Sequence, residues 1–148
     1  MIVSIIKKIS LTTALIFAFT HTALSYDKME IFSFPWNMSL RLALDDPKEI
    51  IKSHFSVYIR GYLYDDNRID AAIKELVYLS DEKPQDLKLV MVLHSKRVID
   101  TLSIDAGGYV YRNGKKYFKV KSLVQFVSEY LPRKHVEALH QRLPDIFD

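Results

Sequence analysis

The sequence contains no cysteine, and this absence removes several kinds of chemistry. Disulfide exchange, thiolate nucleophiles and cysteine-based metal sites all require a thiol. Glycine is scarce as well, with four residues in 148, which leaves little material for a glycine-rich phosphate-binding loop. The G-x-S-x-G and H-E-x-x-H motifs of hydrolases and zinc proteases are also missing. We therefore expect a protein that is not an enzyme and carries no cofactor.

Long hydrophobic runs are confined to the beginning of the chain. Two lysines precede an apolar run at 9–20, and the small residues Ala23 and Ser25 follow at the spacing of a signal-peptidase site. The pattern predicts a secretory signal peptide at 1–25 and a single domain at 26–148. The run is shorter than the roughly 20 residues that a membrane span needs. An uncleaved N-terminal anchor is the alternative.

The charge balance gives no support for nucleic-acid binding. The chain has 21 basic and 18 acidic residues, for a net charge of +3. Two of the basic residues lie in the predicted signal peptide and none of the acidic ones do, so the remaining domain has a net charge of +1. Most of the apparent basicity is thus a targeting feature. A cysteine-free exported domain is more typical of the bacterial periplasm than of eukaryotic secretion.

Four strands in succession are predicted between residues 86 and 121. They cover 87–93, 98–104, 109–112 and 115–120. The first has apolar residues in both alternating sets, which is typical of a strand buried on both faces. The dipeptide Asn113-Gly114 supplies the positive φ angles of a type I′ hairpin between the last two strands. That turn would pair Tyr111 with Lys116, Val110 with Tyr117 and Tyr109 with Phe118.

Strands and helices alternate before this sheet, and helices follow it. Strands are predicted at 30–34 and 55–64, and helices from Pro47, at 68–79, at 122–131 and at 133–143. Stretch 36–46 fits either a strand or a helix. The helix from Pro47 would turn Ile50, Ile51 and Phe55 inward, and Ser122 with Gln125 would form a capping box. The order predicts an α/β (α+β) domain: a thioredoxin-like βαβαββ core with an added β-hairpin and two C-terminal helices.

Histidines and carboxylates do not form a recognisable metal or catalytic motif. After residue 25 the histidines are His54, His94, His135 and His140, and none has a second ligand at the i+3 or i+4 spacing of a helical site. The acidic doublets lie at element boundaries, where helix capping explains them. We therefore expect no metal site and no catalytic residue.

Two surface features remain as candidate partner-binding sites. One is the tyrosine-rich face of the strand at 55–64, formed by Tyr58, Arg60, Tyr62 and Tyr64. Tyrosine and arginine are enriched at protein interfaces, although half-buried strand packing is the alternative explanation. The other is the basic hairpin, with Arg112, Lys115 and Lys119. Its alternative explanation is a solvated face whose lysines protect an edge strand.

Two short segments resemble a known family. Residues 31–35 (IFSFP) and 58–61 (YIRG) are similar to the F-S-x-P and I/L-R-G segments of TrbC-type pilus assembly proteins of conjugative type IV secretion systems. The resemblance covers about 30–79, and the family's Val-Pro segment at the third strand is missing. It implies a periplasmic thioredoxin-like domain that works in pilus assembly.

These observations favour a non-enzymatic periplasmic protein whose function is to bind another protein. The resemblance implies that the partner is a subunit of a secretion machine. The alternative is a periplasmic immunity or inhibitor protein that neutralises a toxin or hydrolase acting on the cell wall. Neither hypothesis predicts binding of nucleic acid, or a membrane span once the signal peptide is removed.

Overall fold

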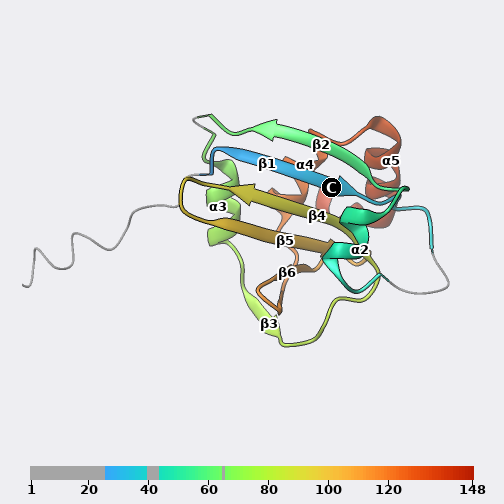
Figure 1. Cartoon of the computed structure of the whole chain (residues 1–148). Helices are drawn as coiled ribbons and strands as arrows, with labels where there is room; N and C mark the ends of the chain where they lie inside the picture. Colours follow the sequence, from blue (N-terminus) through green and yellow to red (C-terminus); the bar gives the residue numbers. More distant parts are fainter. Residues whose placement is uncertain (1–25, 40–43, 65) are drawn as a thin grey trace, which may run out of the picture.

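The computed structural model describes residues 26–39, 44–64 and 66–148. The predicted signal peptide at 1–25 lies outside these residues, as does part of the stretch at 36–46. The elements are β1 (Lys28–Ser33), α2 (Pro47–Lys52), β2 (Val57–Tyr62), α3 (Arg68–Lys74), β3 (Tyr78–Ser80), β4 (Leu87–His94), β5 (Ile99–Asp105), β6 (Val110–Arg112), β7 (Lys115–Tyr117), α4 (Lys121–Ser128), α5 (Arg133–Arg142) and α6 (Pro144–Phe147). The described residues form a mixed α+β domain with one seven-stranded antiparallel sheet and five helices (Figure 1).

The strands lie in the order β2-β1-β4-β5-β6-β7-β3, so β2 and β3 are the edges. The strands predicted at 87–93 and 98–104 are confirmed as β4 and β5. Residues 87–91 of β4 are all buried, as the apolar residues in both alternating sets predicted.

The hairpin between β6 and β7 is confirmed in turn and register. Asn113 and Gly114 have φ angles of 52° and 72°, as a type I′ turn requires. Tyr111 pairs with Lys116 and Val110 with Tyr117. The ladder ends there, because the Phe118 N–H donates to the carbonyl of Val77 instead of pairing with Tyr109.

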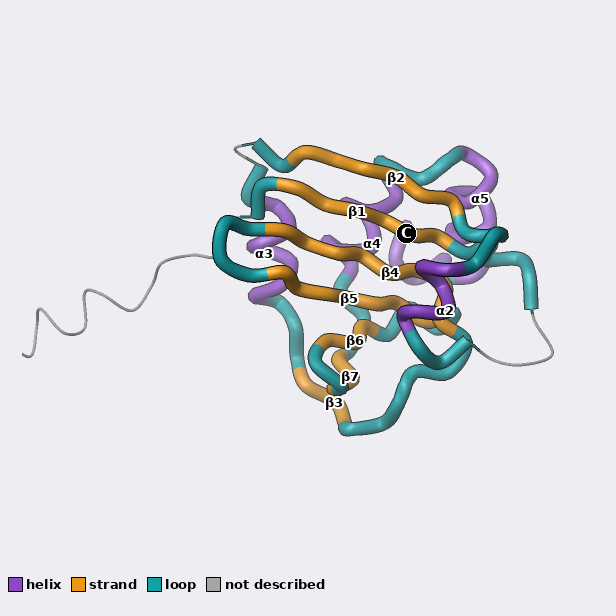
Figure 2. The backbone as a smooth tube through the Cα atoms, viewed as in Figure 1, coloured by secondary structure: helices purple, strands orange, loops and turns teal. Residues whose placement is uncertain are grey.

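Helices α3, α4 and α5 cover one face of the sheet, as Figure 2 shows. The larger hydrophobic core lies between them and the strands. Its fully buried members include Met29, Ile31, Met91, Leu93, Leu102 and Leu123. The inward face of α4 is as predicted, with Leu123, Phe126 and Val127 buried. None of the helices in the described ranges is both long and apolar enough to cross a bilayer.

The opposite face of the sheet is covered only in part. Helix α2 packs there over a smaller core of Phe34, Ile50, Leu87, Val90 and Tyr111. The buried Lys88 lies beside this core, and its ammonium group donates to the Met38 carbonyl at 2.6 Å. Beyond α2, no helix of the described residues lies over the strands β2, β1, β4 and β5 on this face (Figure 1).

One feature of the predicted thioredoxin-like topology is wrong. A strand–helix–strand unit of that kind has parallel strands joined by a crossover helix. Here β1 and β2 are neighbours but antiparallel, with Ile31 opposite Ile59. The chain reverses through α2 at one end of the sheet and does not cross over a face, so β2 returns beside β1 in the opposite direction.

The helix predicted at 68–79 is shorter than its pattern indicated. It ends at Lys74, and Tyr78–Ser80 forms β3, which pairs with β7. Tyrosine and valine near this end are strand formers, and β7 offers them a partner that sequence periodicity does not reveal. As a consequence, β7 is an inner strand, and its lysines do not protect a sheet edge.

Two local predictions around the helices are also wrong. Ile51 and Phe55 were expected inside, but their exposed fractions are 37% and 61%, and only Ile50 is buried. Ser122 was expected to begin a capping box, but α4 begins at Lys121 with no side-chain cap. By contrast, the start of α2 is a complete capping box between Asp46 and Glu49.

Candidate functional site

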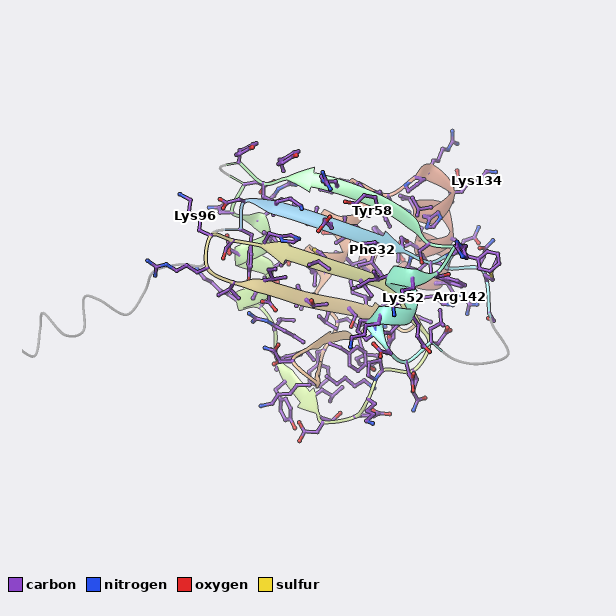
Figure 3. The ribbon with its side chains drawn as sticks, viewed as in Figure 1. Phe32, Lys52, Tyr58, Lys96, Lys134 and Arg142 are labelled. Carbon is purple, nitrogen blue, oxygen red and sulfur yellow. The ribbon has the colours of Figure 1, made fainter. Side chains whose placement is uncertain are left out.

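The uncovered part of the sheet, which we call the open face, is formed by alternate residues of four strands. Pairing across the sheet aligns them in rows. The outer row is Tyr62, Lys28, His94 and Ile99, and the next row is Arg60, Glu30, Val92 and Thr101. Tyr58 and Phe32 begin a third row, which continues beneath α2 (Figure 3). Because strand side chains alternate between faces, every member points away from α3, α4 and α5.

Glu30 is the centre of the open face. Its carboxylate accepts a hydrogen bond of 2.6 Å from the Tyr58 hydroxyl. The His94 Nε2 lies 2.6 Å from its other oxygen, and the Lys28 ammonium lies 3.4 Å from that same oxygen. The Arg60 guanidinium completes the set at 3.7 Å. Three of these partners come from β2 and β4, so the cluster joins three strands.

These contacts keep Glu30 ionised. The Tyr58 hydrogen bond, followed by those of His94 and Lys28, lowers the pKa of Glu30 from 4.5 to about 2. An ionised carboxylate can only accept hydrogen bonds, so His94 Nε2 must carry the proton of their shared bond. At neutral pH Glu30 therefore fixes the positions of its donors and does not exchange protons.

Arg60 is held in place while remaining accessible. Its Nε donates to the Tyr58 hydroxyl at 3.1 Å, and half of its side chain is exposed. The hydrogen bond to the Tyr58 hydroxyl raises the pKa of Arg60. A guanidinium held in this way loses less conformational freedom when it binds a second carboxylate.

Exposed aromatic rings surround this charged centre. Tyr58, Tyr62 and Tyr64 are exposed, and the rings of Tyr62 and Tyr64 stack with an angle of 3° between their planes. Phe32 packs against Tyr58 at a centroid distance of 5.1 Å. Ile99 adds an aliphatic surface at the other end of the outer row. Tyrosine rings with ordered neighbours provide contact area at low entropic cost.

The structure brings one of the two predicted partner-binding sets together. Tyr58, Arg60 and Tyr62 follow one another along β2 at the edge of the sheet, and Tyr64, two residues beyond Tyr62, stacks on its ring. Glu30, Lys28 and His94, which complete the centre, were missed. The alternation of Lys28 and Glu30 with buried Met29 and Ile31 could have placed them on an outer face, but their neighbours come from distant parts of the chain.

The basic hairpin lies elsewhere, and its charges are largely neutralised. Arg112 pairs with the buried Asp100 at 2.6 Å, and Lys119 pairs with Asp145 at 3.2 Å. Lys115 lies over the Tyr78 ring. Strands β1, β4 and β5 separate this hairpin from β2, so the two predicted sets do not form one surface.

Other titratable groups do not gather into a site. Within 26–39, 44–64 and 66–148, no three His, Asp or Glu side chains come close enough to hold a metal ion. A cavity of about 570 Å³ lies between the start of α2 and the hairpin turn, with Thr101, Ser103 and Tyr111 in its wall. Asp46 also lines it, but that carboxylate is already used in capping α2.

Comparison with known proteins identified no relative of this chain. No protein-family model matches the chain, and neither a curated protein nor a solved structure does.

Proposed function

We propose that this protein is a non-enzymatic, exported protein-binding component of an envelope machine, and that the open face is its binding surface. The observation that carries the proposal is the arrangement around Glu30, which holds Tyr58 and Arg60 in place while leaving both exposed. Folding of the domain does not require exposed aromatic side chains to be ordered around a carboxylate that already accepts several hydrogen bonds. A binding surface benefits from this order, because side chains that are ordered in advance lower the entropic cost of association.

The charges of the open face favour an acidic partner. Glu30 is surrounded by donors, whereas Arg60 and Lys28 keep exposed surface. Lys96, labelled in Figure 3, and its neighbour Arg97 are both exposed and extend the positive charge along the β4–β5 turn. A partner that offers carboxylates among apolar side chains would complement both the cations and the tyrosine rings.

Two parts of the proposal, that the protein is exported and that it belongs to a pilus assembly machine, are based on sequence patterns. The segments that resemble TrbC-type pilus assembly proteins lie at the end of β1 and in β2, two adjacent strands of the open face. Their thioredoxin-like fold would require these two strands to be parallel, so the resemblance supports a role in conjugative pilus assembly and not that topology. Tyr26, the first residue after the predicted cleavage site, is buried in the larger core and donates to Asp100, so removal of the signal peptide at that site would leave this contact intact.

The test is site-specific photo-crosslinking in living cells. A photoreactive amino acid replaces Tyr62 on the open face, and Tyr78 of β3 serves as the control because its exposed fraction of 51% is close to the 58% of Tyr62. We expect a crosslink at Tyr62 to one envelope protein and none at Tyr78. A crosslink to a cell-wall hydrolase would favour the inhibitor hypothesis. Equal labelling at both positions, or none, would refute the open face as the binding surface.

A further inference from the structure

The edge of β2 exposes unpaired backbone groups. The Leu63 N–H donates to the Asp27 carbonyl at 3.0 Å, which shows that the odd-numbered residues of β2 turn their backbone groups toward β1. The Phe34 N–H, just after β1, donates to the Lys88 carbonyl in β4, which indicates that even-numbered residues of β1 turn their backbone groups toward β4. The odd-numbered residues of β1 then face β2, where they pair with odd-numbered residues. The N–H and C=O groups of Tyr58, Arg60 and Tyr62 therefore point away from the sheet, where no strand of the described chain lies beside them (Figure 2).

This edge lacks most of the features that keep sheet edges from pairing. Such features include a short strand, a bulge, a proline or a charged side chain, most often lysine, and of these β2 has only the charged Arg60. The sequence of β2, VYIRGY, contains no proline or lysine, and its register against β1 is unbroken over six residues. The opposite edge differs, because β3 has three residues and an irregular register.

We propose that a second copy of this chain pairs with β2 in antiparallel fashion, about a two-fold axis at Ile59. The outward groups belong to even-numbered residues, so a hydrogen-bonded pairing must join even to even. Two antiparallel registers meet this condition and pair most residues of β2 with the second copy. One is centred on Ile59 and the other on Arg60. The second sets two Arg60 side chains directly opposite each other, which is destabilising.

The register centred on Ile59 is self-complementary. It places Arg60 opposite the partner's Tyr58, and Tyr58 opposite the partner's Arg60. An arginine beside a tyrosine is favourable through cation–π contact and hydrogen bonding. Within the chain, the Arg60 Nε already donates a hydrogen bond of 3.1 Å to the Tyr58 hydroxyl. The axis is perpendicular to the sheet, so the two open faces lie on the same side of one continuous sheet and double the tyrosine surface.

The absence of cysteine makes a direct test available, because any introduced thiol is the only one in the chain. In the proposed register Ile59→Cys brings two thiols opposite each other across the axis, within disulfide reach. Val57→Cys is the matched control, since it lies on the same strand and face but opposite the partner's Gly61. We expect mild oxidation to link Ile59→Cys and to leave Val57→Cys and Arg60→Cys unlinked. Linking of Arg60→Cys instead would overturn the register.

A second measurement does not depend on replacing the half-buried Ile59. Arg60→Pro removes an N–H that points away from β1, and an edge strand tolerates proline at such a position. We expect sedimentation equilibrium of the full exported protein to give twice the chain mass, and Arg60→Pro to reduce it to the single mass with unchanged circular dichroism. A wild-type protein that stays monomeric at every soluble concentration would overturn the dimer. Photo-crosslinking of Tyr62 to another protein would survive that result, so the two proposals fail separately.

Discussion

The Tyr58 hydroxyl donates a 2.6 Å hydrogen bond to Glu30, a residue 28 positions earlier in the chain, across the β1–β2 pair. The two are diagonal neighbours, because Glu30 lies opposite Arg60 and Tyr58 lies opposite Phe32. This contact positions both the ring of Tyr58 and, through its oxygen, the guanidinium of Arg60. The architecture of the open face depends on it.

Glu30→Gln should change how stability responds to acid. The pKa of Glu30 is about 2 in the folded protein and near 4.5 when unperturbed, so its ionised form stabilises the fold above pH 4.5. That contribution is lost as the pH falls from 4.5 toward 2. We expect the wild type to be more stable than Glu30→Gln at neutral pH, with the difference shrinking over this window in urea unfolding.

Glu137→Gln is the matched control for that experiment, since Glu137 is exposed on α5 and pairs with Arg133 one turn earlier in the same helix. Its unfolding midpoint should follow the wild type at each pH. If Glu30→Gln does so as well, the cluster around Glu30 does not stabilise the fold.

Arg112→Ala should destabilise the protein instead of weakening a partner contact. Arg112 donates twice to Asp100, which is 6% exposed and also accepts from Tyr26. Removing it leaves a buried carboxylate without its cation, at a cost of about 2–3 kcal/mol. Chemical denaturation measures the loss. Lys115→Ala, in the same hairpin, should change stability by less than about 0.5 kcal/mol; similar losses from both would contradict this role.

Gly114→Ala should also destabilise the fold, for a backbone reason. Gly114 has a φ of 72°, and no atom lies within 4 Å of the position that a Cβ would take, so steric contact adds nothing. The left-handed conformation alone costs about 1 kcal/mol for a residue with a Cβ. The urea midpoint should fall accordingly. An unchanged midpoint would mean that the turn relaxes at no cost.

Local signals predicted the fold best. The turn at Asn113-Gly114 determined the hairpin register, and the apolar residues of β4 indicated a strand covered on both sides. Strand β3 was missed because Tyr78 pairs with Tyr117, a contact between distant segments that periodicity cannot show. The direction of β2 was wrong for the same reason, since the order of elements does not determine whether neighbouring strands run parallel.

The candidate site was predicted in part. The alternation of Tyr58, Arg60 and Tyr62 identified one exposed strand face. Glu30 was not predicted because the residue that bonds its second oxygen, His94, lies 64 positions away. For the basic hairpin, the sequence did not reveal the ion pairs of Arg112 and Lys119, because their carboxylate partners, Asp100 and Asp145, come from other elements.

Export predicts a defined N-terminus. If the signal peptide at 1–25 is removed, the protein recovered from the cell envelope should begin at Tyr26. Intact-mass spectrometry of that fraction gives the answer directly. A chain that retains residues 1–25 in the membrane fraction would indicate an uncleaved anchor, and a full-length chain in the cytoplasm would contradict export.

The most direct test of the open face is a binding measurement with the partner identified by crosslinking. Tyr62→Ala/Tyr64→Ala removes the two stacked rings, and Tyr78→Ala/Phe118→Ala removes two exposed rings from the opposite end of the sheet. We predict that the first variant weakens binding at least about tenfold, as expected for loss of interface tyrosines, while the second binds like the wild type. Equal affinity of both variants for the partner would contradict the assignment of the open face as the binding surface.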